Sequence, residues 1–109
     1  MKKTNTLVSV IMNCYNGEKY LLESIQSVLD QTYKNWELIF WDNKSKDNSK
    51  KLFRSIKDTR LKYYCSRINC SLYKARNLAI KKCKGEFIAF IDVDDKWFKN
   101  KLEVQIKKF

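Results

Sequence analysis

The sequence predicts an α/β fold in which a largely parallel β-sheet is flanked by helices. Apolar runs of strand length alternate with amphipathic segments of helix length along the whole chain, and the joints between them are short. Such alternation is typical of β-α-β units joined by right-handed crossovers. The 109 residues include no proline and no linker-like tract, and they suffice for one hydrophobic core. We therefore expect a single domain over residues 1–109.

The first half of the chain predicts a strand, a helix, a strand and a helix, in that order. The strands are apolar runs ended by polar residues, and the first helix carries apolar residues at every third or fourth position. Gly17 supplies the turn before this helix, and an acidic or amide side chain is available to cap the second one. The expected elements are Leu7–Asn13, Glu18–Gln31, Trp36–Trp41 and a helix from Asp47 or Asn48 to about Lys57.

The second half repeats the pattern. Leu61–Cys65 is a short strand, and the helix that follows runs from about Ser71 to Lys84, with lysines in its last turn. Gly85 lies just past this helix, a common way for a helix to end. The fourth strand, Glu86–Ile91, holds five consecutive apolar residues, which predicts burial on both faces. A last helix is expected at Lys99–Phe109.

The composition indicates a globular, basic, cytoplasmic protein. The formal net charge is +11, from 23 Lys and Arg against 12 Asp and Glu, which favours an acidic partner. The charge is spread along the chain and is mostly lysine, so solvated helix faces explain much of it. No apolar run approaches the ~18 residues of a membrane span, and there is no signal-peptide pattern. The four cysteines show no zinc-site spacing, so we expect reduced thiols.

Three carboxylates directly follow the apolar run of the fourth strand: Asp92, Asp94 and Asp95. In an extended chain Asp92 and Asp94 point to the same side. Two carboxylates about 4 Å apart repel by roughly 4 kcal/mol at an effective dielectric near 20, and a divalent cation reverses this. Oxygen ligands of this kind suit Mg²⁺ or Mn²⁺. The alternative is a solvated turn whose acids cap a helix.

The same sheet edge gathers further polar residues, because ligands of open α/β sheets sit outside the carboxyl ends of the strands. Tyr15 offers a ring face for a base, while Asp42 and Asn43 offer hydrogen-bond partners for base or ribose. Each also has a structural reading, as a packing aromatic or a turn residue. The chain has neither a G-x-G-x-x-G nor a P-loop pattern, and the absence of histidine excludes Ser-His-Asp chemistry.

Five ordered blocks of this chain closely resemble the family 2 glycosyltransferases of GT-A fold, over residues 7 to 109. They begin with the first strand and end with the acidic turn. The blocks are Val8–Asn16, Ser27–Tyr33, Trp41–Asp47, Ala75–Asn77 and Gly85–Asp95.

The resemblance implies a βαβαβαβα GT-A fold and a nucleotide-diphospho-sugar donor, most simply a UDP-sugar, with Mg²⁺ or Mn²⁺ as cofactor. It implies an inverting transfer to a glycan or lipid-linked acceptor in cell-surface polysaccharide synthesis, in the cytoplasm or on the inner face of the membrane. The implied nucleotide-sugar-binding residues are Asn13, Tyr15, Asn16, Asp42, Asn43, Arg76, Asp92 and Val93. The implied metal ligands are Asp92, Asp94 and Asp95.

The chain departs from the family pattern at three places. Asn43 stands where the second acid of an Asp-Asp pair is usual, and Lys44 and Cys70 stand where glycines are usual. None of the residues present corresponds to the general base that deprotonates the acceptor hydroxyl. We therefore expect the nucleotide-binding half of a longer enzyme, truncated before the acceptor half and catalytically incomplete by itself.

Two alternative functions remain open at this stage. The net charge, with Trp97 and Phe98 as exposed aromatics, fits a nucleic-acid-binding module, although the glycosyltransferase reading requires no nucleic acid. The lysines and aromatic residues of the last helix fit a peripheral membrane surface. These residues are Trp97, Phe98, Lys99, Lys101, Lys107, Lys108 and Phe109.

Overall fold

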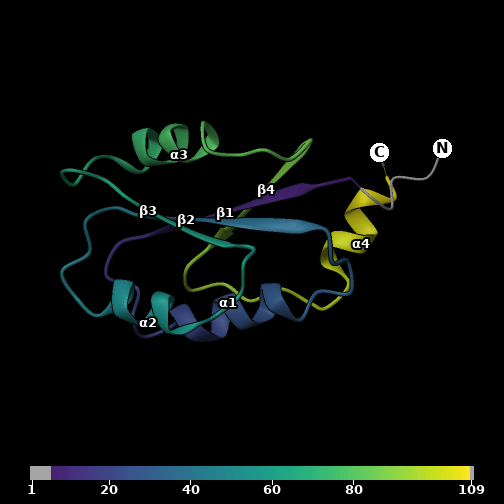
Figure 1. Ribbon diagram of the computed structural model, residues 1–109, viewed down its shortest axis with the longest axis horizontal. Coiled ribbons are helices and arrows are strands. Elements are labelled where there is room, and N and C mark those ends of the chain that lie inside the picture. Colours follow the sequence, from purple (N-terminus) through teal and green to yellow (C-terminus); the bar gives the residue numbers. More distant parts are fainter. Residues whose placement is uncertain (1–5, 109) are drawn as a thin grey trace.

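The computed structural model describes residues 6–108, and its elements alternate as predicted (Figure 1). Each predicted strand and helix is present, in the predicted order. The helices end earlier than expected, because turns of the 3₁₀ type close their last residues. Phe109, the predicted last residue of the fourth helix, lies outside the described residues. The elements are β1 Val8–Cys14, α1 Leu21–Leu29, β2 Trp36–Asp42, α2 Ser49–Ser55, β3 Leu61–Cys65, α3 Leu72–Ile80, β4 Phe87–Asp92 and α4 Lys101–Ile106.

The sheet is parallel throughout, with strand order β3-β2-β1-β4. The strands are added on one side of β1 up to β3 and on its other side at β4, so β1 pairs with β2 on one side and with β4 on the other. The register aligns Cys14 with Asp42 and Asn13 with Asp92. Because all strands run the same way, the residues that follow β1, β2 and β4 reach the same edge. This confirms the predicted α/β class and places the predicted site residues along one edge.

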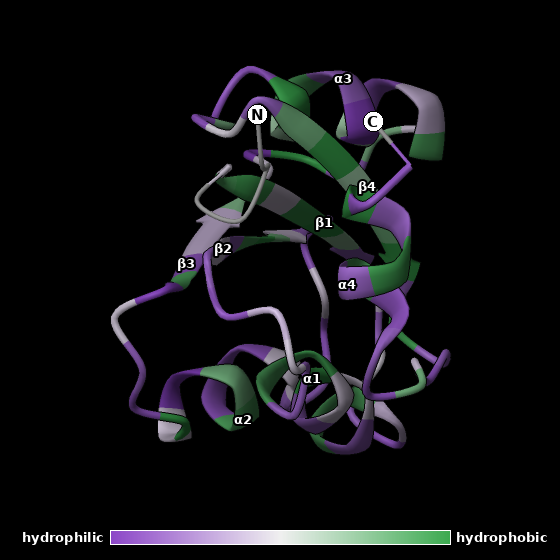
Figure 2. Cartoon of the chain, turned by 90° about the vertical axis from the view of Figure 1, so that its right-hand side faces the viewer, coloured by the Kyte–Doolittle hydropathy of each residue, from purple (hydrophilic) through white to green (hydrophobic). Residues whose placement is uncertain are grey.

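The helices cover the two faces of the sheet unequally (Figures 1 and 2). Helices α1, α2 and α4 bury their apolar side chains against one face, where Leu21, Phe53 and Leu102 belong to the larger core cluster. Helix α3 alone covers the other face through Ala75 and Ala79, which are fully buried. These small side chains let the α3 backbone approach the sheet closely. No helix among residues 6–108 is long and apolar enough to cross a membrane.

The prediction that the fourth strand is buried on both faces is wrong. In β4, Ile91 is buried, but Ile88 is 40% and Phe90 46% exposed. The physical reason is lateral position, since β4 ends the four-stranded sheet and α3 lies over β1 and β2. The fully buried strand is instead β2, in which even Glu37 and Asp42 are buried.

The predicted ending of the third helix at Lys84 and Gly85 is also wrong. Helix α3 ends at Ile80, and Gly85 does not adopt a left-handed conformation. The chain turns early because the Lys84 N–H donates to the buried carboxylate of Glu37, 2.7 Å away. Gly85 then passes against β1, where its N–H donates to Ser9 Oγ at 2.8 Å. Its lack of a side chain serves close packing and not helix capping.

The Gly85→Ala substitution is expected to lower the free energy of unfolding by about 1–3 kcal/mol. A Cβ at this position would lie 2.7 Å from Leu7 O and from Ser9 N, both backbone atoms that cannot rotate away. Urea denaturation followed by circular dichroism measures the effect. Lys84→Ala is the control, because it keeps the backbone bond to Glu37 and removes only an exposed side chain. Equal midpoints for the two variants would contradict the close approach.

Candidate functional site

The carboxyl edge of the sheet is formed by three loops that follow β1, β2 and β4. The β1 and β2 loops are fastened together by hydrogen bonds between side chains and backbone. Asn16 Oδ1 accepts from Lys46 N at 2.7 Å, and Ser45 Oγ accepts from Asn16 N at 2.9 Å. One turn further on, Asp47 Oδ2 accepts from Glu18 N at 3.1 Å and Ser49 Oγ accepts from Gly17 N at 3.0 Å. The two loops therefore form one rigid unit.

Sequence reasoning missed the roles of Ser45, Asp47 and Ser49 in this unit. Asp47 accepts from both the N–H and the hydroxyl of Ser49, at 3.0 and 2.6 Å. Burial alone would raise the pKa of Asp47, but the hydrogen bonds from Ser49 and from Glu18 N–H outweigh it and hold this pKa below its usual value. The available signal was the density of Ser, Asp and Asn in residues 43–49, which is typical of side-chain-to-backbone bonding.

Asp42, a predicted nucleotide-binding residue, is 2% exposed at the end of β2. Its Oδ1 accepts from Ser45 N at 2.8 Å, which closes the turn in which Lys44 has a φ of 61°. Its Oδ2 accepts from the hydroxyl of Tyr63 on β3 at 2.6 Å. Asp42 thus holds the loop that follows its own strand, and any contact with a ligand is made by a carboxylate that is already fixed in place.

Asn43 makes a reciprocal pair of hydrogen bonds with Cys70. Its Oδ1 accepts from Cys70 N at 2.9 Å, and its Nδ2 donates to Cys70 O at 2.6 Å. The side chain of Asn69 also donates to the carbonyl oxygen of Asn43, at 3.0 Å. The side chain of Asn43 therefore anchors the loop between β3 and α3. This structural role was not predicted, and the predicted contact of Asn43 with a base or ribose stays a prediction.

Asn13 and Tyr15 present groups suited to a ligand at the end of β1. The Nδ2 atom of Asn13 is buried and has no hydrogen-bond partner among the described residues. A buried amide donor without a partner is costly, and a bound ligand that offers an acceptor oxygen would relieve this. The side chain of Tyr15 is 47% exposed, so one face of its ring is accessible to a base.

The loops that follow β1 and β4 pack closely at Gly17, which lies against Cys14 and Val93. A Cβ on Gly17 would lie 2.7 Å from Val93 Cγ2 and 2.9 Å from Cys14 Sγ, so the β1 and β4 loops touch here. Burial raises the pKa of the Cys14 thiol, although the neighbouring serine hydroxyls act in the opposite direction. Cys14 is therefore a neutral packing residue. Val93 packs against Gly17 in this way, and its predicted contact with the donor stays a prediction.

The acidic segment after β4 forms a turn. Asp95 N donates to Asp92 O at 2.9 Å, and the hydroxyl of Ser24 on α1 donates to the same carbonyl at 3.2 Å. The expectation that Asp92 and Asp94 share one side of an extended chain is therefore wrong, because the chain bends after Asp92. Asp92, Asp94 and Asp95 are exposed, and Asp95 Oδ1 accepts from Lys96 N at 2.9 Å.

Helix α3 brings Arg76 to this turn. Arg76 Nη2 lies 3.9 Å from Asp92 Oδ1, and the guanidinium lies 5.5 Å from the centre of the Phe90 ring. The side chains of Arg76 and Asp92 are 43% and 71% exposed, so this pair contributes little to stability. It does place a cation and a carboxylate together beside the end of β1, where a diphosphate would find both.

The donor chemistry of the acidic turn fits a hard divalent cation in one specific way. Within residues 6–108, no three His, Cys, Asp or Glu side chains converge as ligands of a metal ion. Mg²⁺, however, typically takes one or two protein carboxylates and completes its shell with water and substrate phosphates. The exposed carboxylates of Asp92 and Asp94 fit that requirement. The arrangement is suited to a metal that arrives with a phosphorylated ligand.

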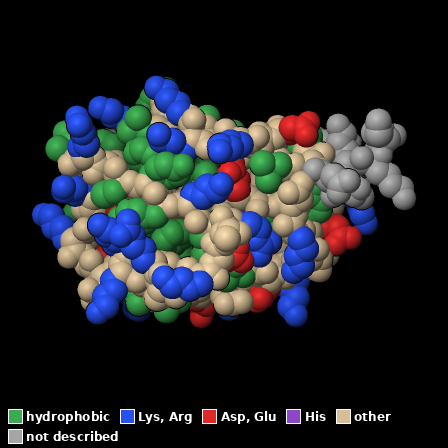
Figure 3. Space-filling view, in the orientation of Figure 1, with side chains coloured by type: hydrophobic (Ala, Val, Ile, Leu, Met, Phe, Trp, Pro, Cys, Tyr) green, Lys and Arg blue, Asp and Glu red, His purple; other side chains and the backbone are tan. Residues whose placement is uncertain are grey.

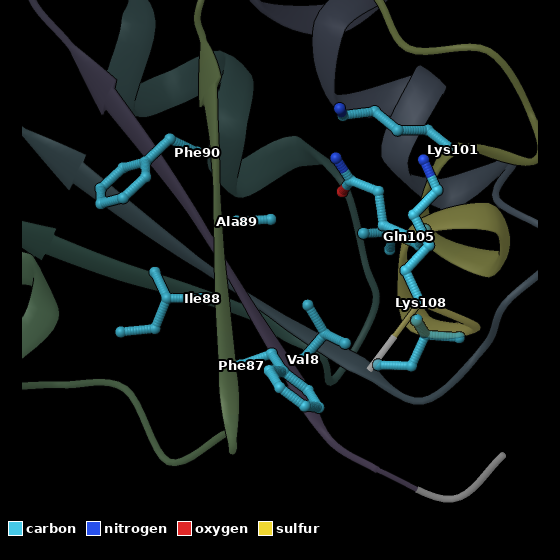
Figure 4. Close-up of a pocket in the computed structure, with 10 residues that line it drawn as sticks. Val8, Phe87, Ile88, Ala89, Phe90, Lys101, Gln105 and Lys108 are labelled. Carbon is cyan, nitrogen blue, oxygen red and sulfur yellow. The ribbon is translucent and has the colours of Figure 1, made fainter. Parts of the chain in front are cut away.

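The groove in Figure 4 is separate from this edge. It has a volume of about 420 Å³ and lies between β4 and α4, where Ile88 and Lys101 are among its lining residues. None of the predicted site residues lines it. Nearby, Phe98 is 86% exposed, as expected. Trp97 was also predicted to be exposed, but it is partly buried, because it packs against the core beside Lys101.

An open parallel sheet with polar loops at its carboxyl edge defines the class of α/β proteins, whose ligands are typically bound at that edge. The sequence profile described as "Glycosyl transferase family 2" matches residues 9–109, and the chain belongs to that family. It is 47% identical over 100 residues to the Escherichia coli UDP-Glc:alpha-D-GlcNAc-diphosphoundecaprenol beta-1,3-glucosyltransferase WfgD, and 39% identical over 104 residues to WfaP of the same description. Each match covers 92% of this chain and 40% of the relative.

Solved structures show the same fold. The chain superimposes on S. aureus TarS 1-349 in complex with UDP-GlcNAc with a TM-score of 0.87 and 31% identity, covering 98% of this chain and 30% of TarS. The mannosyltransferase PcManGT of Pyrobaculum calidifontis, in complex with GDP-Man and Mn²⁺, gives a TM-score of 0.77 at 24% identity, covering 83% of this chain and 28% of that chain, which shows the fold alone. The predicted family and GT-A fold are thereby confirmed. The chain spans about two fifths of the length of WfgD and WfaP.

Proposed function

We propose that this chain binds the nucleotide-diphospho-sugar donor of a glycosyltransferase, and that the donor is a UDP-sugar. The observation that carries the proposal is the register of the sheet, which aligns Asn13 with Asp92 and Cys14 with Asp42. It brings an accessible tyrosine ring, an unpartnered amide donor and exposed carboxylates to one edge. WfgD is named for UDP-Glc, and TarS was solved with UDP-GlcNAc, which supports uridine as the base.

In this proposal each group contacts a different part of the donor. The ring of Tyr15 stacks on the base, and the Asn13 amide donates to an oxygen of the nucleotide. Asp92 and Asp94 hold Mg²⁺ or Mn²⁺ together with the diphosphate, and Arg76 lies beside them as a second cation. The metal, when bound, neutralises the charge that develops on the departing diphosphate. The roles of Asn16, Asn43, Val93 and Asp95 as further contacts remain part of the proposal.

The acceptor is proposed to be a lipid-linked glycan in cell-surface polysaccharide synthesis, with inversion at the transferred sugar. The names of WfgD and WfaP include a diphosphoundecaprenol-linked acceptor. We assign no general base among residues 6–108. The chain spans 40% of the length of these relatives, and donor binding is the part of the activity that we propose for it.

A nuclear magnetic resonance titration of the 109-residue chain with UDP-glucose tests the donor site. With Mg²⁺ present, the amide signals of Tyr15, Asp42 and Asp94 are expected to shift together and saturably. Replacing Mg²⁺ by paramagnetic Mn²⁺ should broaden the signals around Asp94 first, because the cation lies at that turn. GDP-mannose serves as the control for the base. Unchanged spectra with UDP-sugars in the presence of either metal would contradict the proposal.

A further inference from the structure

Helix α3 carries its large apolar side chains outward. Its inward residues are Ala75 and Ala79, both fully buried, whereas Leu72 is 52% and Tyr73 78% exposed. Ile68, in the loop before the helix, is 72% exposed. Exposed apolar side chains that gather on one surface mark an interaction site more often than scattered ones do. Together with Arg67 and Lys74, these three residues form what we call the α3 surface.

The charge around the α3 surface has a single sign. Residues 59–85 contain no Asp or Glu. Figure 3 shows hydrophobic side chains surrounded by Lys and Arg over the part of the molecule where α3 and β3 lie. Three basic residues of this segment, Arg60, Lys62 and Arg76, pair with acids from elsewhere. The remaining ones form no ion pair within residues 6–108: Arg67, Lys74, Lys81, Lys82 and Lys84.

A hollow of about 460 Å³ opens beside Arg67, Ile68 and Lys74 of the α3 surface. Apolar and thiol side chains line it, including Trp41, Leu78 and Cys70, and Arg67 and Lys74 lie at the same opening. An apolar hollow bordered by cations matches an amphipathic ligand with a negative head and a hydrocarbon body. The combination of exposed Ile68 and Leu72 with unpaired lysines is typical of surfaces that lie in the headgroup region of a bilayer.

We infer that the α3 surface binds anionic phospholipid at a membrane. Ile68, Leu72 and Tyr73 enter the headgroup region, while Arg67 and Lys74 contact the lipid phosphates. The inference goes beyond the proposed function, because neither the donor nor its metal requires a membrane. It also differs from the sequence-based alternative, which placed the membrane surface on the last helix. In α4, Leu102 and Ile106 are buried in the core, which leaves Val104 as the exposed apolar residue of that helix and Phe98 as the exposed aromatic before it, while Phe109 lies outside the described residues.

The α3 surface is connected to the proposed donor site by two sets of contacts. The loop that carries Ile68 is tied to Asn43 through Cys70, and α3 carries Arg76 to Asp92. A membrane bound at the α3 surface would therefore lie beside the carboxyl edge of the sheet. A lipid-linked acceptor approaching along that membrane would reach the same edge.

Sedimentation with vesicles tests the inference on the 109-residue chain. With vesicles of phosphatidylcholine containing 30% phosphatidylglycerol, the wild-type chain is expected to co-sediment, and with pure phosphatidylcholine to remain in solution. The double variants Ile68→Ser/Tyr73→Ser and Arg67→Glu/Lys74→Glu should each weaken this binding at least tenfold. The matched control Phe98→Ser/Lys99→Glu changes an exposed aromatic and a lysine before α4, and it should bind like the wild type.

Two outcomes would overturn the inference. One is loss of vesicle binding in the Phe98→Ser/Lys99→Glu variant with binding retained in both α3-surface variants. The other is a wild-type chain that does not co-sediment with the anionic vesicles. Binding of an oligonucleotide in place of the vesicles would show that the α3 surface recognises nucleic acid. Circular dichroism of every variant checks folding. The UDP-glucose titration of the α3-surface variants separates this result from the donor site, because those variants should bind the nucleotide sugar normally.

Discussion

Asp94→Ala is expected to weaken the metal-dependent binding of a UDP-sugar by more than about tenfold, while the melting temperature stays unchanged. Asp94 is exposed, and its carboxylate forms no hydrogen bond or ion pair within residues 6–108. Removing it also relieves repulsion with the neighbouring acids. Asp94 therefore has no structural partner to lose within these residues, and the expected loss of affinity follows from its role in the proposed metal site.

Isothermal titration calorimetry with UDP-glucose and Mn²⁺ measures this effect. Asp30→Ala is the matched control, because Asp30 is an exposed acid that follows α1 and accepts only from Gln26. Both variants remove one negative charge, so a general electrostatic effect would appear in both. In the presence of a chelator, Asp94→Ala and the wild type should bind the nucleotide with the same residual affinity. Unfolding of the Asp94→Ala variant would show instead that the acids are structural.

The order of the elements was predictable because each strand and helix has its own periodicity. β1, β2 and β3 lie within a residue or two of the ranges read from the sequence. The gathering of Asp42, Tyr15 and Asp92 at one edge was also predictable, since parallel strands end on the same side. These predictions depend on local pattern and on general rules of α/β topology.

The burial of β4 and the end of α3 were not predictable from local pattern. An apolar run such as Phe87–Ile91 looks the same in a central strand and at the end of a sheet. Which strand is covered depends on where α3 packs, and this is set by Ala75 and Ala79. A glycine at position 85 could equally end a helix or allow close packing. The buried Glu37, which is distant in sequence, favours close packing here because its carboxylate accepts a hydrogen bond from Lys84 N.

The hydrogen bonds between the loops of the site were the least predictable feature from the sequence. Asn43 and Cys70 are separated by 27 positions, and Asn16 and Lys46 by 30. Bonds between a side chain and the backbone of another loop leave no periodic signal, and Asn is equally suited to contact a nucleotide. The anchoring of one loop to another by Asn43 and Asn16 therefore became visible only in the structure, and their predicted contacts with a ligand stay a prediction.

Asp42→Ala is expected to lower the free energy of unfolding by about 3 kcal/mol, a larger effect than at any exposed acid of the site. The carboxylate is buried and accepts two hydrogen bonds, from Ser45 N and from the Tyr63 hydroxyl. Its removal leaves both donors without a partner in the core and frees the turn at Lys44. Urea denaturation measures the change, and Asp42→Asn, which keeps the volume and one acceptor, should lose less.

The variant Tyr63→Phe tests whether the loss of stability in Asp42→Ala comes from the hydrogen bond between these two side chains. Burial raises the pKa of Tyr63 far above its ordinary value of 10.0, and the carboxylate of Asp42 raises it further. The folded state therefore holds the tyrosine proton more tightly than the unfolded state, so this stabilisation is complete below pH 10 and is lost as the pH rises above it. Tyr63→Phe should make the alkaline part of the stability profile less steep, while Tyr33, Cys14 and Cys83, whose pKa values burial also raises, still contribute to it. If the Asp42→Ala and Tyr63→Phe losses were additive in the double variant, the two side chains would not be coupled, because a shared hydrogen bond is lost only once.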